Sequence, residues 1–260
     1  MSSFRFKKFE IIQEHSAMKV NTDGVLLGAW VSISGDERAM LDVGTGTGVI
    51  AIMAAQRHVC ANQSKPERTG PAHILAIDID KDSLADAAEN ISRCGFCGEN
   101  LRMGTELIPF QQMSAEIHGK YDLIISNPPY FINSLKAADE QRSNARHTDT
   151  LGQGEFIQAS VKLLKPGGRA ALILPAAEGE QLLSKISFLE ERCPEGEASL
   201  HLCRLCKVHT TIKKPAKRWL MEFILSDKAP EVGYTQLVIM RNGEFSPEYK
   251  SLTADFYLNF

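Results

Sequence analysis

Short apolar runs alternate with longer amphipathic stretches along most of the chain from residue 39 onward. The apolar runs are rich in β-branched residues and predict strands at 39–43, 73–78, 107–110, 121–126 and 169–174. The stretches between them repeat apolar residues at helical spacing and predict helices at 49–57, 81–93 and 156–164. Regular alternation of this kind favours right-handed crossovers and a mostly parallel sheet that is covered by helices on both faces.

The pattern changes after a further helix, which is predicted at 178–191. Three strand-like runs then follow without a long helix between them, at 200–208, 219–225 and 236–240. Consecutive strands with short links are typical of an antiparallel edge added to a parallel sheet. We therefore expect an α/β protein with a doubly wound, Rossmann-like sheet and an antiparallel C-terminal edge. The chain is interpreted as one domain, 1–260, in which an extension of residues 1–38 packs on a core of residues 39–260.

Composition and charge narrow the class of protein further. With 43% apolar residues in a chain of 260, the protein can bury a full core. Its 29 Lys and Arg against 32 Asp and Glu give a formal charge of −3, so nucleic-acid binding would need a local basic patch. No apolar run approaches the roughly 20 residues of a membrane span, and residues 4–9 are too interrupted for a signal peptide. We therefore expect a cytoplasmic protein that makes no membrane contact.

A glycine-rich loop follows the first strand of the predicted core. Gly44, Gly46 and Gly48 allow a tight turn and a close approach of the backbone to a ligand. The loop is an imperfect dinucleotide fingerprint, because Val49 stands where the third glycine of Gly-x-Gly-x-x-Gly is required. Asp42, two residues before the first glycine, would repel a pyrophosphate but can accept a hydrogen bond from an ammonium, such as that of S-adenosylmethionine.

A second acid, Asp78, ends the next predicted strand. A carboxylate at this position can accept hydrogen bonds from both hydroxyls of a ribose. It lies 30 residues beyond Gly48, where about 20 is usual for the dinucleotide fold, and a polar surface loop at 60–71 accounts for the excess. Ile79 is assigned to the same cofactor site, whereas Asp80 either contributes to the site or only caps the following helix.

The tetrapeptide Asn127-Pro128-Pro129-Tyr130 stops the strand predicted at 121–126. Two prolines end a strand because neither donates to the ladder and each fixes φ near −65°. The turn leaves an amide and an aromatic ring at the carboxyl end of a central strand, which is where ligands bind in open α/β sheets. These four residues are therefore the candidate catalytic residues.

Such a site suits methylation of a conjugated amino nitrogen, for example the exocyclic nitrogen of adenine. The side-chain oxygen of Asn127 and the carbonyl of Pro128 can accept both N–H bonds and turn the nitrogen lone pair toward a sulfonium methyl. Catalysis then needs only positioning and stabilisation of the charge that develops on nitrogen. Tyr130 would stack on a base turned out of its own stack.

In this order the glycine loop, Asp78 and the Asn-Pro-Pro-Tyr tetrapeptide resemble those of the class I S-adenosylmethionine-dependent methyltransferases. The chain is more closely similar to bacterial enzymes that methylate N6 of adenosine 37 in a valine tRNA. This resemblance covers almost the whole chain, and its most specific parts are residues 4–9 and 17–30. Residues 249–257 also resemble the end of that family.

The resemblance implies a seven-stranded sheet, S-adenosylmethionine as cofactor and tRNA as partner. It implies that residues 1–38 lie over the methionine end of the cofactor, with Lys19 and Thr22 in contact with it and Asp23 as a further candidate. Many relatives carry an acid or a serine after the third strand of the core, whereas this chain has Gln111-Gln112-Met113 there. Gln112 is therefore the candidate for contact with the adenine of the cofactor.

Basic residues gather between two of the C-terminal strands. The loop between these strands contains Lys213, Lys214, Lys217 and Arg218 and could reach the phosphates of an RNA. Three further residues follow the Asn-Pro-Pro-Tyr turn and could line the RNA entrance, namely Arg142, Arg146 and His147. The alternatives are a solvated basic loop and, for His147, a helix cap or a plain surface position.

Two Cys-x-x-Cys pairs, at 94–97 and 203–206, raise the question of a zinc site. The pairs lie too far apart in the sequence for a zinc ribbon, and one falls in a predicted strand, where residues i and i+3 face opposite sides. We therefore expect reduced, partly buried thiols and no metal.

The leading hypothesis is an RNA adenine-N6 methyltransferase. The same tetrapeptide also suits guanine N2 of ribosomal RNA or a glutamine amide in a protein. From a different class, the chain could bind S-adenosylmethionine and RNA without catalysis, although an intact Asn-Pro-Pro-Tyr argues against that. No obligate protein partner is expected.

Overall fold

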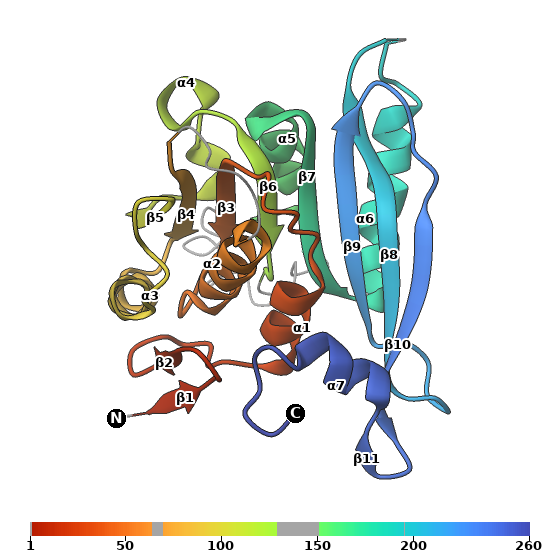
Figure 1. Ribbon diagram of the computed structural model, residues 1–260. Coiled ribbons are helices and arrows are strands. Elements are labelled where there is room, and N and C mark those ends of the chain that lie inside the picture. Colours follow the sequence, from red (N-terminus) through yellow and green to blue (C-terminus); the bar gives the residue numbers. More distant parts are fainter. Residues whose placement is uncertain (1, 64–69, 129–150, 195) are drawn as a thin grey trace, which may run out of the picture.

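The computed structural model describes residues 2–63, 70–128, 151–194 and 196–260 and is shown in Figure 1. Within these residues one sheet of nine strands spans the molecule, in the order β11-β10-β8-β9-β7-β6-β3-β4-β5. A separate two-stranded hairpin lies near the N-terminus. No helix in the described part of the chain is long and apolar enough to cross a membrane.

The parallel half of the sheet contains five strands, and each neighbouring pair in it is parallel. They are β3 (Ala39–Val43), β4 (Ala72–Asp78), β5 (Leu101–Leu107), β6 (Tyr121–Ser126) and β7 (Leu164–Pro175). The helices that connect or follow them are α2 (Val49–Asn62), α3 (Lys81–Arg93), α4 (Ala115–His118), α5 (Gln153–Leu163) and α6 (Ala176–Glu190). The predicted alternation of strands and helices is confirmed.

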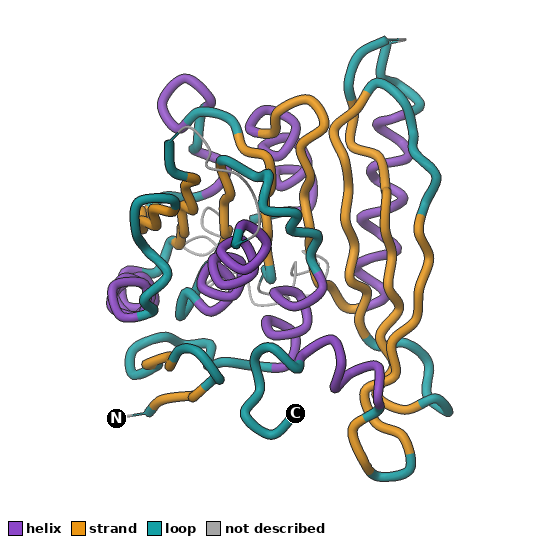
Figure 2. The backbone as a smooth tube through the Cα atoms, in the orientation of Figure 1, coloured by secondary structure: helices purple, strands orange, loops and turns teal. Residues whose placement is uncertain are grey.

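The sheet separates two hydrophobic cores, because successive side chains of a strand point to opposite faces. Met40 of β3 belongs to the core under α1 (Thr22–Trp30) and α2, whereas the next residue, Leu41, belongs to the core under α5 and α6. Figure 2 shows the helices in front of and behind the strands. Both faces of the sheet are therefore covered, which explains the nearly continuous apolar runs of its central strands.

The C-terminal part of the sheet is larger than expected. It contains β8 (Ser199–Thr211), β9 (Arg218–Ser226), β10 (Gly233–Arg241) and β11 (Glu244–Phe245), so the sheet has nine strands and not seven. β9 is antiparallel to both β7 and β8, as predicted, but β10 is parallel to β8. β10 is parallel to β8 because residues 227–232 carry the chain across β8, which therefore lies between β9 and β10.

The strand predicted at 107–110 is wrong. β5 ends at Leu107, and Phe110 instead begins a short 3-10 helix, η1 (Phe110–Gln112). β5 is an edge strand in which Leu101 alone is fully buried, so its sequence lacks the apolar pattern of a central strand. β7 also begins earlier than expected, at Leu164, because the glycines after it form a bulge in the strand.

The two ends of the chain meet at one edge of the molecule. The N-terminal hairpin consists of β1 (Ser3–Arg5) and β2 (Glu10–Ile12), and it lies near α7 (Pro247–Thr253) in Figure 1. The amide of Lys7 donates to the carbonyl of Phe256 at 2.8 Å, and the rings of Phe6 and Tyr257 stack at 6.1 Å. These contacts hold both termini near the carboxyl ends of the parallel strands.

Candidate active site

A cavity of about 310 Å³ lies at the carboxyl ends of β3, β4 and β6. Its wall combines the glycine loop, the residues that follow β4 and β6, and an N-terminal segment of residues 16–21. Most of the residues that the sequence assigns to a cofactor site therefore face one space. They include Lys19, Gly44, Gly46, Asp78, Ile79 and Asn127.

The glycines of the loop have two different structural roles. Gly44 and Gly46 line the cavity with φ of 68° and 55°, in the left-handed region that favours glycine. A Cβ on Gly44 would meet nothing within 4 Å, so the bare backbone there opens onto the cavity. Gly48 does not line the cavity. With φ of 80° it caps α2, and a Cβ on it would lie 3.3 Å from the backbone of Ala87, so it permits α3 to pack closely.

Asp42 lies behind the loop and is not part of the cavity wall. Its Oδ2 accepts hydrogen bonds from the hydroxyl of Thr45 at 2.6 Å and from the amide of Ala51 at 3.1 Å. Its Oδ1 has no hydrogen-bond partner among the described residues, and burial raises the pKa of Asp42 to about 7. The contacts seen hold the loop to the first turn of α2. The contact of Asp42 with a cofactor ammonium stays a prediction.

Asp78 lies on the cavity wall and is held in place from both sides. Its Oδ2 accepts from the amide of Gly46 at 2.8 Å, and its Oδ1 accepts from the amide of Asp80 at 2.9 Å. Asp80 caps α3 by accepting from the amide of Ser83 at 2.6 Å, and it also lines the cavity, so both of its proposed roles are compatible. Ile79 is 52% exposed and presents an apolar side chain beside this carboxylate.

Asn127 and Pro128 follow β6 and close the other side of the cavity. The hydroxyl of Ser126 donates to the carbonyl of Val43 at 2.9 Å, which ties the end of β6 to the start of the glycine loop. The side chain of Asn127 makes no hydrogen bond within the described ranges, and its Nδ2 lies 3.8 Å from the position of a Cβ on Gly24. An unpartnered amide at a cavity wall is available to a ligand.

Five predicted site residues lie outside the described residues. These are Pro129, Tyr130, Arg142, Arg146 and His147.

The N-terminal segment is anchored by two buried side chains of α3 that the sequence analysis did not identify. Asp86 accepts hydrogen bonds from the amides of His15 and Ser16, at 3.0 and 2.8 Å, and from the His15 ring at 2.9 Å. The hydrogen bond to Asp86 raises the pKa of His15. Asn90 bonds both to Ile12 and to the carbonyl of Thr47 in the glycine loop. Their signal in the sequence is a pair of polar residues at i and i+4 on a buried helix face.

Three other residues assigned to the cofactor lie in different places, namely Lys19, Thr22 and Gln112. Lys19 lines the cavity, and its ammonium donates to the carbonyl of Gln13. Thr22 lines a second cavity on the other side of α1. Gln111 lines the candidate active site, whereas Gln112 is exposed and does not. Successive residues of a 3-10 turn point about 120° apart. Phe110 points into the core, so Gln111 and Gln112 face two other directions.

The basic residues of the loop at 213–218 have two different surroundings. Lys213 and Lys214 are exposed in the turn between β8 and β9. Lys217 and Arg218 line the second cavity, where the Nε of Arg218 lies 2.7 Å from the Oδ2 of Asp23 on α1. The loop is thus an exposed hairpin connection, as expected, and its contact with RNA stays a prediction.

The cysteines are free thiols with different surroundings. Burial raises the pKa of Cys203 to about 11, and its thiol donates to the carbonyl of Glu222 at 3.1 Å. Cys94 and Cys206 are buried, and Cys97 is exposed.

Comparisons with known proteins show which family the chain is similar to. The chain matches the family model described as a methyltransferase domain over residues 34–223. It is 39% identical to the tRNA1(Val) (adenine(37)-N6)-methyltransferase of Trichodesmium erythraeum, over all of this chain and 99% of that protein. The protein of the same name from Parabacteroides distasonis is 41% identical, with 98% and 97% covered.

The fold also matches a crystal structure from Agrobacterium tumefaciens described as a predicted O-methyltransferase. The TM-score is 0.60 at 14% identity, with 90% of this chain and 96% of that chain covered. At that identity the likeness concerns the fold alone. Full-length similarity to the named relatives, together with the methyltransferase-domain match, confirms the resemblance found in the sequence: the chain belongs to the tRNA1(Val) (adenine(37)-N6)-methyltransferase family.

Proposed function

We propose that this protein transfers a methyl group from S-adenosylmethionine to N6 of adenine 37 in a valine tRNA. The observation that carries the proposal is the side-chain amide of Asn127, which makes no hydrogen bond to any residue that the structure describes and shares one cavity with the glycine loop and Asp78. The names of the full-length relatives supply the substrate. Because the substrate is tRNA, we also propose that the protein works in the cytoplasm.

The residues of the cavity fit S-adenosylmethionine. The bare backbone at Gly44 and Gly46 leaves room for the cofactor against the loop, and Asp78 offers carboxylate oxygens to the ribose hydroxyls. The apolar side chain of Ile79 would lie against the adenine ring. Residues 16–21, with Lys19 among them, would cover the methionine end. When bound, the cofactor would supply a methyl group on a sulfonium, whose sulfur is a good leaving group because it departs as a neutral thioether.

The chain's own contribution to the reaction is to hold the target nitrogen. The Oδ1 of Asn127 and the carbonyl of Pro128 would each accept one N–H bond of the adenine amine. This arrangement orients the lone pair toward the methyl group and stabilises the positive charge that develops on nitrogen. The proton leaves after the methyl transfer, when the nitrogen has become acidic, so no dedicated base is required from these residues.

The proposal is tested by mass spectrometry of nucleosides from purified valine tRNA. A strain that lacks this gene should lose one N6-methyladenosine, and the wild-type gene should restore it. A gene that encodes Asn127→Ala should not restore it at comparable protein level. An unchanged N6-methyladenosine content in the deletion strain would show that the protein has another substrate.

A further inference from the structure

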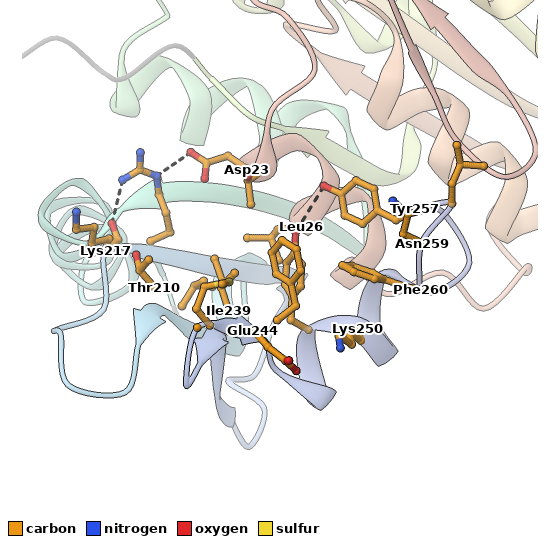
Figure 3. Close-up of a pocket in the computed structure, with 18 of the residues that line it drawn as sticks. Asp23, Leu26, Thr210, Lys217, Ile239, Glu244, Lys250, Tyr257, Asn259 and Phe260 are labelled. Atoms are coloured by element: carbon orange, nitrogen blue, oxygen red, sulfur yellow. Dashed lines mark hydrogen bonds and ion pairs between the residues drawn. The ribbon is translucent and has the colours of Figure 1, made fainter.

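A second and larger cavity, of about 1060 Å³, opens on the other side of α1 and is shown in Figure 3. We call it the C-terminal groove. Its lining comes from β1, α1, β8, the start of β9, the β10–β11 hairpin, α7 and the last residues of the chain. None of the residues that line it also lines the candidate active site.

The first turn of α1 contributes residues both to the groove and to the candidate active site. Asn21 and Gly24 line the active-site cavity, whereas Thr22 and Asp23 line the groove. The Asp23 carboxylate is bound by Arg218, so this turn is fixed to the start of β9. A polymer with one unit in the active site can therefore reach the groove with another.

The lining of the groove combines aromatic rings with aliphatic side chains. Leu26 and Ile239 are among the aliphatic residues, and Tyr257 and Phe260 are among the aromatic ones, as Figure 3 shows. The ring of Phe245 lies 5.2 Å from that of Phe260 and leaves 42% of its residue surface exposed. An exposed ring backed by other rings is a suitable surface for stacking a nucleobase.

The position of Phe245 is fixed by the backbone on both sides. Before it, Asn242 and Gly243 have φ of 54° and 85°, the left-handed pair that forms a tight hairpin turn. After it, the buried Ser246 caps α7 by accepting from the amide of Tyr249 at 3.0 Å. The ring itself stacks on that of Tyr249 at 5.2 Å and contacts that of Phe260, so little freedom is lost when a ligand binds.

Positive charge borders the same space. The basic lining residues outnumber the acidic ones, with Arg5, Lys217, Arg218 and Lys250 against Asp23 and Glu244. Asp23 is already paired with Arg218, whereas the ammonium of Lys217 is exposed and has no ion-pair partner in the described part of the chain. A basic side chain beside an exposed aromatic ring is the combination that binds single-stranded nucleic acid.

We propose that the C-terminal groove binds a second nucleotide of the tRNA substrate, outside the target adenine. Its base stacks on Phe245, and its phosphate lies at Lys217. The inference rests on the proposed function, because it takes tRNA as the substrate. It adds a binding subsite that positions the RNA while Asn127 holds the adenine.

The test measures the affinity of unmodified valine tRNA for Phe245→Ala and Lys217→Ala by fluorescence anisotropy over a series of salt concentrations. Loss of one base–aromatic stack should weaken binding at least about fivefold. Loss of one phosphate contact should reduce the slope of log Kd against log salt by roughly 0.7 to 0.9. The matched controls are Phe188→Ala and Lys185→Ala, exposed residues of α6 outside the groove, and they should bind like wild type. Wild-type affinity for S-adenosylmethionine in each variant shows that it is folded.

Two outcomes separate this inference from the proposed function. If both groove variants bind tRNA like wild type while the wild-type protein methylates it, the groove is not an RNA subsite and the methylation stands. If the wild-type protein does not methylate valine tRNA, the proposed function fails and the groove inference fails with it.

Discussion

Replacing Asn127 by alanine removes one of the two acceptors proposed for the adenine amine. The side chain makes no hydrogen bond to other described residues, so its removal should change the free energy of unfolding little. The loss should be felt in the transition state, where the amine becomes positively charged and its N–H groups donate most strongly.

The size of the effect follows from comparison with other preorganised polar contacts. Removing one such group at a developing charge costs about 2.7–4 kcal/mol. The carbonyl of Pro128 remains in the variant, so the lower value applies. At about 1.36 kcal/mol per factor of ten, kcat should fall by roughly 10²-fold.

The assay is single-turnover methylation of valine tRNA with radiolabelled S-adenosylmethionine, alongside calorimetric measurement of cofactor affinity. Asn100→Ala, at an exposed position outside both cavities, is the matched control and should keep wild-type turnover. Equal losses of cofactor affinity and of turnover would refute the reasoning, because Asn127 would then bind the cofactor and not the target nitrogen.

Three other predictions concern the surroundings of the site. Gly48→Ala should lower the free energy of unfolding by at least about 1 kcal/mol, because φ of 80° is strained for alanine and its Cβ would crowd α3; an unchanged urea midpoint would contradict this. The hydrogen bond to Asp86 raises the pKa of His15. The stability that this pair gives to the folded protein is therefore complete below about pH 6.5 and is lost as pH rises through the raised pKa. Cofactor affinity should fall over that range, and Asp86→Asn should remove the dependence if the pair causes it. Charge reversal at Lys213 and Lys214 should raise the Kd for RNA and flatten its salt dependence, whereas an unchanged slope would exclude the turn as an RNA contact.

The parts of the site that could be predicted from the sequence are those fixed by local backbone rules. Asp78 ends one apolar strand and Asn127 follows another, and parallel strands bring their carboxyl ends to one edge of a sheet. The glycines at 44 and 46 mark a left-handed turn at the same edge. Because these signals are local, the positions of the residues on the cavity wall agree with the prediction.

The parts that could not be predicted depend on contacts between distant segments. From the sequence, Arg218 was grouped with the neighbouring lysines. In the structure Arg218 forms an ion pair with Asp23, which lies 195 positions away in the chain. The sequence assigned Thr22 to the cofactor, but the turn of α1 directs this residue into the other cavity. The parallel pairing of β10 with β8 has the same origin, because the path of residues 227–232 past β8 leaves no pattern in the sequence.

Site-resolved methylation in vitro tests the central claim most directly. The purified protein is incubated with S-adenosylmethionine and an unmodified valine tRNA transcript, or with a transcript in which guanosine replaces adenosine 37, and the products are mapped by mass spectrometry. We expect one N6-methyladenosine at position 37 of the first transcript and no methylation of the second. Equal methylation of both transcripts, or none of either, would contradict it.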